Sequence, residues 1–181
     1  MLNNVSCINY LIKMKVLFVG RFQPLHKGHL LIIQYASKKY DEVIIGVGSS
    51  QYNHTKHNPF SSEERKMMLE RSLKNIEINN YSVVFIPDIH NYPKWVPYVT
   101  SIISDFDAVI SNSPLTKRLF SEKGFTVEET PLYDRSKYSG KEIRRRIIND
   151  EDWEDLVPES VYEIIKEIQG VKRLKDLAKQ E

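Results

Sequence analysis

Short apolar runs alternate with longer amphipathic segments along most of this chain. The apolar runs predict buried strands at residues 15–19, 42–47, 82–87, 108–110 and 125–127. The segments between them have helical spacing and predict helices at residues 29–39 and 61–74, from Pro93 onward, and at 113–124. After Tyr138 the pattern is helical to the end, with interruptions near Pro158 and Gly170. This alternation predicts an α/β fold: a doubly wound parallel sheet of about five strands, helices on both faces, and a helical C-terminal segment.

Sheets of this kind bind ligands at the carboxyl ends of their strands, near the point where the strand order reverses. Four polar or turn-rich loops follow the predicted strands. They cover residues 20–28, 48–60, 88–95 and 111–114. We expect the chemistry of the protein to be concentrated in these loops.

Length and composition favour one domain at residues 14–181, because 181 residues with 41% hydrophobic content can bury one sizeable core. Met14 directly precedes the first strand, so residues 1–13 are interpreted as an N-terminal extension outside the fold. The 26 basic and 24 acidic residues are interleaved, a balance that predicts no nucleic-acid or membrane partner. A lone Cys7 cannot form an intrachain disulfide, which favours a cytoplasmic location.

The strongest chemical signal is the loop GRFQPLHKGH at residues 20–29. His26 and His29 are three residues apart at a helix start, so both can point toward the positive end of the helix dipole. Gly28 has no side chain to keep a phosphate from the backbone, and Arg21 can donate a fork of hydrogen bonds to phosphate oxygens. The loop therefore predicts an anion-binding site.

A second signal is YSGKEIR at residues 138–144. Ser139 and Glu142 have the spacing of a capping box, so the segment is also typical of a well-capped helix without further function. The same helix start can receive phosphate oxygens, and Arg144 lies on its first turns. The adjoining Arg145 and Arg146 are interpreted as solvated residues or as partners in a subunit contact.

A third group follows the predicted third strand. It contains Asp88, Asn91 and Trp95. Trp95 fits a core position on an amphipathic helix as well as an aromatic platform for a ligand. The sequence has no convincing Ser-His-Asp or Cys-His set and no convincing metal-ligand spacing, so we predict no protein-bound metal.

The histidine loop is similar to the HxGH signature of the nucleotidyltransferase superfamily, and in its extended form it resembles the archaeal nicotinamide-nucleotide adenylyltransferases. The second segment resembles the ISGTxIR motif of that family, with Lys141 in place of the threonine and Tyr138 in place of the leading isoleucine. The resemblance implies a Rossmann-like fold and adenylyl transfer from ATP to nicotinamide mononucleotide (NMN), giving NAD and pyrophosphate. It also implies Mg²⁺ accompanying ATP, and a homo-oligomer such as a hexamer.

The resemblance assigns roles to individual residues. The catalytic set is His26, His29, Arg21 and Arg144. Gly28, Ser139, Gly140 and Lys141 would bind the ATP phosphates, and Trp95, Asp88, Tyr138 and Asn91 would bind NMN.

Two other functions stay open at this point. An enzyme of the same superfamily could use phosphopantetheine, FMN or glycerol phosphate as the acceptor, because the histidine loop is common to all of them. A non-catalytic sensor that binds ATP or NAD is the other alternative.

Overall fold

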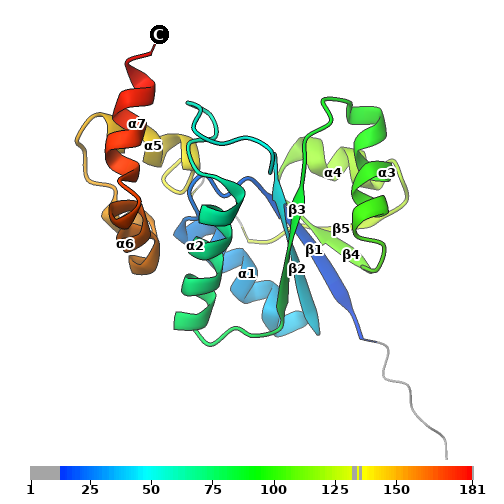
Figure 1. The fold of residues 1–181 in the computed structure, drawn as a ribbon. Coiled ribbons are helices and arrows are strands. Elements are labelled where there is room, and N and C mark those ends of the chain that lie inside the picture. Colours follow the sequence, from blue (N-terminus) through cyan, green and yellow to red (C-terminus); the bar gives the residue numbers. More distant parts are fainter. Residues whose placement is uncertain (1–12, 132–133, 135, 181) are drawn as a thin grey trace, which may run out of the picture.

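The computed structural model describes residues 13–131, 134 and 136–180. Its centre is a five-stranded parallel sheet with helices on both faces (Figure 1). The strands are β1 (Lys15–Gly20), β2 (Glu42–Gly48), β3 (Tyr81–Ile86), β4 (Ala108–Ile110) and β5 (Thr126–Glu128). The predicted α/β fold is confirmed.

The strand order is β3-β2-β1-β4-β5, so the chain winds outward from β1 in one direction and then in the other. The reversal lies between β1 and β4, where Phe18 is in register with Ile110. Because both strands point the same way, the loop after β1 and the loop after β4 begin side by side. This is the crevice in which such sheets bind ligands.

Two helical layers cover the sheet (Figure 1). Helices α1 (Lys27–Lys39) and α2 (Ser62–Asn75) lie on one face, and α3 (Tyr92–Ile102) and α4 (Pro114–Ser121) lie on the other. Successive strand residues point to opposite faces, so Val16 and Phe18 pack in the core under α1 and α2, whereas Leu17 packs under α3 and α4. A strand buried on both faces explains the continuous apolar runs of the sequence.

The C-terminal segment forms α5 (Gly140–Ile148), a 3₁₀ turn η1 (Glu154–Leu156), α6 (Glu159–Glu167) and α7 (Gly170–Ala178). The predicted interruptions are confirmed: Pro158 precedes α6, and Gln169, with φ 55°, precedes α7. The break between α5 and η1 was not predicted. Asp150 turns the chain there with φ 57°, and the buried Trp153 holds the turn against the core. No helix among the described residues has the length and apolar character needed to cross a membrane.

Helix starts are set by local hydrogen bonds. The capping box of α2 is present as predicted, since Ser61 N donates to Glu64 and Glu64 N donates to Ser61. Helix α1 begins two residues before the predicted start, at Lys27, because His26 is its N-cap. Residues 1–12 lie outside the described residues, so the boundary at residue 13 stays a prediction.

The core that contains the C-terminal helices also contains β1, β2 and α1. We therefore expect Ile164→Ala, which empties a fully buried position of α6, to lower the free energy of unfolding of the whole domain by about 2–5 kcal/mol. Urea unfolding should remain a single transition. The exposed Glu163→Ala on the same helix is the control, with an expected change within about 0.5 kcal/mol. A separate, earlier transition of the C-terminal helices in Ile164→Ala would contradict the single domain.

Candidate active site

The start of α1 is capped by two histidines that bond to each other's backbone. His29 N donates to Nδ1 of His26 at 3.2 Å, and His26 N donates to Nδ1 of His29 at 3.4 Å. The rings stack with centroids 3.5 Å apart. Because each Nδ1 accepts a hydrogen bond, each neutral ring carries its proton on Nε2. The pair therefore offers two N–H donors at the positive end of a helix.

Both histidines are neutral near pH 7. Burial lowers the pKa of His26 to about 4. Burial also lowers the pKa of His29 well below its usual value, and a charge on His26 would lower it further. The pair thus acts on a ligand through hydrogen bonds and the helix dipole.

The start of α5 meets the histidine loop. Ser139 caps this helix by accepting from Glu142 N at 3.2 Å. Arg144 is buried, and its Nη1 donates to the carbonyl oxygen of Gln23 at 2.6 Å. A Cβ on Gly140 would lie 2.6 Å from the same oxygen, so only glycine permits this approach. Burial, followed by the charge of Arg21, lowers the pKa of Arg144 to about 10, which leaves it cationic.

One cavity of about 340 Å³ lies between the two helix starts. Nine of the residues proposed from the sequence line it: Arg21, His26, Gly28, His29, Tyr138, Ser139, Gly140, Lys141 and Arg144. The wall is completed by Phe18, Val19, Gly20, Phe22, Gln23, Ile32, Ser111, Asn112 and Ser113. Among the described residues no carboxylate lines this cavity, so its formally charged residues, Arg21, Lys141 and Arg144, are all positive.

Gly28 is required for a reason that the sequence did not reveal. A Cβ at this position would lie 2.9 Å from Cβ of Tyr138 and 3.1 Å from Nδ1 of His26. The space that a side chain at position 28 would need is therefore filled by Tyr138, from the segment before α5. Tyr138 therefore lines the cavity together with the histidine pair, and its assignment to NMN binding stays a prediction.

The predicted capping box of α5 is incomplete, and this is a correction. Glu142 does not return a bond to the cap. Its carboxylate accepts from Arg145 Nε at 2.9 Å and from Arg146 Nε at 2.8 Å. These arginines hold the pKa of Glu142 at about 2. Arg145 also pairs with Glu151, so both arginines have partners within the chain.

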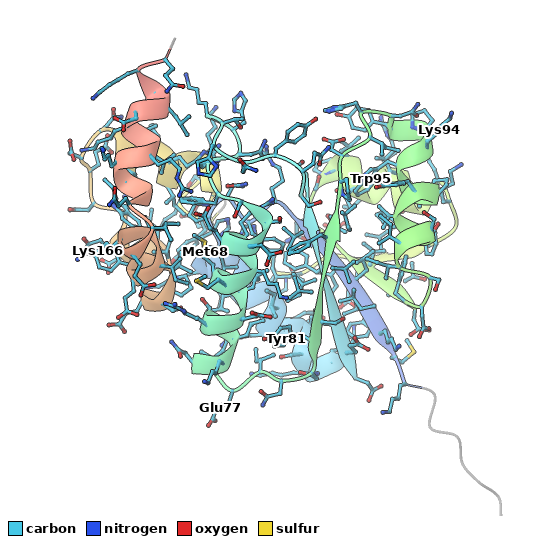
Figure 2. The ribbon with its side chains drawn as sticks, viewed as in Figure 1. Met68, Glu77, Tyr81, Lys94, Trp95 and Lys166 are labelled. Carbon is cyan, nitrogen blue, oxygen red and sulfur yellow. The ribbon has the colours of Figure 1, made fainter. Side chains whose placement is uncertain are left out.

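Asp88, Asn91 and Trp95 do not line the cavity. Asp88 accepts from His90 N at 2.9 Å, and Asn91 caps α3 by accepting from Lys94 N at 3.1 Å. Trp95 is half-buried and packs edge-on against Phe120, with ring centroids 5.5 Å apart. Figure 2 shows Trp95 on the side of α3 that faces the sheet. Trp95 therefore packs against the core while part of its surface stays exposed, and its role toward a ligand stays a prediction.

Two residues that hold the site together, Gln23 and Arg65, were not predicted from the sequence. Gln23 is buried, and its side-chain amide donates to Phe60 O at 2.8 Å and accepts from Phe60 N at 3.0 Å. Arg65, fully buried on α2, donates to the carbonyl oxygen of Arg21. Gln23 stands inside the histidine motif, directly before Pro24, and this position was the signal available in the sequence. A buried arginine beside Glu64 has no such local signal.

Among the described residues, no group of three or more His, Cys, Asp or Glu side chains is arranged to hold a metal ion.

Comparison with known proteins gives the family. Residues 17–146 match the cytidylyltransferase-like family model. The nicotinamide-nucleotide adenylyltransferase of Archaeoglobus fulgidus is 47% identical over 170 residues, which cover 91% of this chain and 98% of the relative. This chain belongs to the nicotinamide-nucleotide adenylyltransferases. The adenylyltransferase of Pyrococcus horikoshii is 48% identical over 163 residues, covering 90% of this chain and 88% of that one. The resemblance inferred from the two motifs is confirmed.

Solved structures agree on the fold of this adenylyltransferase. A bifunctional NMN adenylyltransferase/ADP-ribose pyrophosphatase from Francisella tularensis, complexed with AMP and a manganese ion, aligns with a TM-score of 0.74 at 24% identity. The alignment covers 92% of this chain and 52% of that protein, so this chain spans about half its length. A nicotinate-nucleotide adenylyltransferase from Vibrio parahaemolyticus aligns with a TM-score of 0.59 at 16% identity, over 85% of this chain and 99% of that one.

The lowered histidine pKa values predict an acid-sensitive adenylyltransferase. Between pH 6.5 and 5 the unfolded chain binds protons that folded His26 and His29 do not bind, so the free energy of unfolding should fall as the pH falls. Each histidine contributes up to about 1.4 kcal/mol per pH unit. His26→Gln should remove about one histidine's share of this slope. Urea unfolding at several pH values measures it, and an unchanged slope in His26→Gln would contradict the assignment.

Proposed function

We infer that this chain transfers the adenylyl group of ATP to NMN, giving NAD and pyrophosphate. Family membership at 47% identity supports the reaction. The observation that carries it for this chain is the shared cavity, in which the histidine pair from α1 faces Arg144 and the start of α5. A cavity with two helix N-termini, two arginines and no described carboxylate suits a triphosphate.

In the proposed mechanism, a phosphate oxygen of NMN attacks the α-phosphorus of ATP. A new P–O bond forms as the bond from the α-phosphorus to the bridging oxygen breaks, and the electron pair leaves with pyrophosphate. The NMN phosphate is already an anion near neutral pH, so no side chain need remove a proton. Catalysis then consists of alignment and stabilisation of developing charge.

Different residues are proposed to bind different phosphates of ATP. The Nε2–H groups of His26 and His29 donate to the α-phosphate oxygens, where charge develops in the transition state. Arg144, together with the N–H groups at the start of α5, holds the β- and γ-phosphates and the pyrophosphate that leaves. Arg21 and Lys141 add positive charge at the mouth of the cavity, Lys141 in place of a threonine hydroxyl.

Mg²⁺ is proposed to enter with ATP. The cavity lining has no carboxylate among the described residues, so phosphate oxygens and water would be its ligands. When bound, the ion neutralises phosphate charge.

NMN is proposed to lie toward the carboxyl end of β3, where Asp88, Asn91 and Trp95 are located. An indole beside the electron-poor nicotinamide ring is favoured by the electrostatics of cation–π attraction. The active protein is proposed to be a homo-oligomer such as a hexamer.

A comparison of acceptors tests the reaction directly. With ATP and Mg²⁺, we expect NMN to give NAD and pyrophosphate, and nicotinate mononucleotide is tested beside it for the deamido product. FMN, phosphopantetheine and glycerol phosphate should give no adenylylated or otherwise nucleotidylated product by chromatography. Binding of ATP in calorimetry without any product would favour the non-catalytic sensor.

The histidine pair provides a sharper test of the mechanism. Removing one donor that stabilises transition-state charge costs about 10²–10³-fold in turnover, so we expect His29→Ala to lower kcat by this factor. The variant also loses the acceptor for His26 N, at a cost of about 1 kcal/mol of stability. Steady-state kinetics and urea unfolding measure the two effects separately. A folded His29→Ala protein with normal kcat would remove His29 from the mechanism.

A further inference from the structure

Among the residues that the structure describes, Arg65 is the largest fully buried side chain, with 0% of its surface exposed. All three nitrogens of its guanidinium group donate to main-chain carbonyl oxygens. Nε donates to Ser61 at 3.1 Å, Nη1 to Arg21 and Gly48 at 2.8 Å each, and Nη2 to Ser49 at 3.3 Å. The buried guanidinium group therefore bonds only to neutral carbonyl groups here, and none of these four bonds goes to a carboxylate.

The four carbonyl groups belong to three separate segments. Arg21 is in the histidine loop after β1, Gly48 and Ser49 are at the end of β2, and Ser61 is the N-cap of α2. Ser49 also has a left-handed backbone, with φ 50°, which a non-glycine residue adopts only at a cost. The single planar guanidinium group therefore fixes the spacing between the loop after β1 and the loop after β2, at the carboxyl edge of the sheet.

The neighbouring acid does not pair with Arg65. Glu64 forms a bidentate pair with Arg173, at 2.8 and 2.9 Å. Burial, and then the charge of Arg21, lowers the pKa of Arg65 to about 10, so it remains cationic at neutral pH. The Arg65 cation thus lies directly behind the main chain of Arg21, whose own side chain lines the cavity.

We propose that Arg65 is a positioning residue for adenylyl transfer, which acts by holding the main chain of Arg21 so that the Arg21 guanidinium meets the ATP phosphates. The proposal rests on the proposed function. It differs from a general stabilising role, because a residue that acts through Arg21 has no effect on the reaction when the Arg21 side chain is absent.

The test is a double-mutant cycle of Arg65→Lys and Arg21→Ala. Lysine keeps the charge but cannot reach four carbonyl groups with one planar fork. Since a misplacement of about 1 Å can cost about 10²-fold, we expect Arg65→Lys to lower kcat about 10–100-fold in the parent protein. In the Arg21→Ala protein it should lower kcat by less than about 3-fold, because coupled residues are not additive. The free energy of unfolding should fall equally in both backgrounds.

Arg71→Lys is the matched control on the same helix. Arg71 pairs with Glu167 at the surface, at 3.0 Å, and lies outside the cavity, so kcat should be unchanged. The dissociation constant of ATP, measured by calorimetry, gives a second readout that needs no acceptor. Arg65→Lys should weaken ATP binding about tenfold in the parent and by less than about 3-fold in Arg21→Ala.

The outcomes separate the two hypotheses. A parent protein that binds ATP but forms no NAD contradicts the proposed function, and the ATP cycle still tests Arg65. Equal loss of kcat and of ATP affinity in both backgrounds, or no loss in either, overturns the positioning role. If Arg65→Lys does not fold, Arg65→Gln, which keeps two N–H donors, takes its place in the cycle. If neither variant folds, Arg65 serves the fold itself and the proposal is overturned.

Discussion

Buried positive charge at the carboxyl edge of the central strands is the constraint on which the site depends. Arg65 and Arg144 are both buried, and the bonds of both go to main-chain carbonyl groups. Arg21 is close enough for its charge to lower the pKa of each. Gathering like charges away from water is unfavourable unless an anion balances them. A polyphosphate would supply that balance, and no described carboxylate in the cavity would compete with it for the arginines.

The acidic residues near this region are paired elsewhere. Glu64 pairs with Arg173, and Glu142 pairs with Arg145 and Arg146. A carbonyl dipole can orient a guanidinium group without cancelling its charge, whereas a carboxylate would cancel it. The separation of ion pairs from carbonyl-bound arginines therefore leaves the positive charges of Arg65 and Arg144 without a bonded carboxylate.

The histidine pair joins helix stability to chemistry. Each ring caps α1 through Nδ1, and this same bond leaves Nε2 as the donor toward the cavity. Burial keeps both rings neutral, so they are donors without a charge of their own. The fixed tautomer and the helix dipole are in place before any ligand binds, which is the preorganisation that charge-stabilising catalysis requires.

The sequence by itself determined the features that depend on neighbouring residues. Apolar runs predicted all five strands to within one residue at each end. Ser61 with Glu64 predicted the start of α2, because periodicity and capping act within a few residues. The histidine motif and the segment at residues 138–144 identified nine of the residues that line the cavity, because each motif is contiguous.

Only the tertiary structure decided how these pieces meet. Arg144 bonds to Gln23 across 121 residues, and Tyr138 fills the space beside Gly28. Glu142 bonds to Arg145 and Arg146 of its own helix and not to the cap. Arg65 donates to carbonyl groups of three segments. A main-chain carbonyl has the same chemistry at every position, so the sequence cannot show which ones a buried guanidinium will reach. The packing of the sheet and its helices determines which carbonyl groups lie within reach of the guanidinium group.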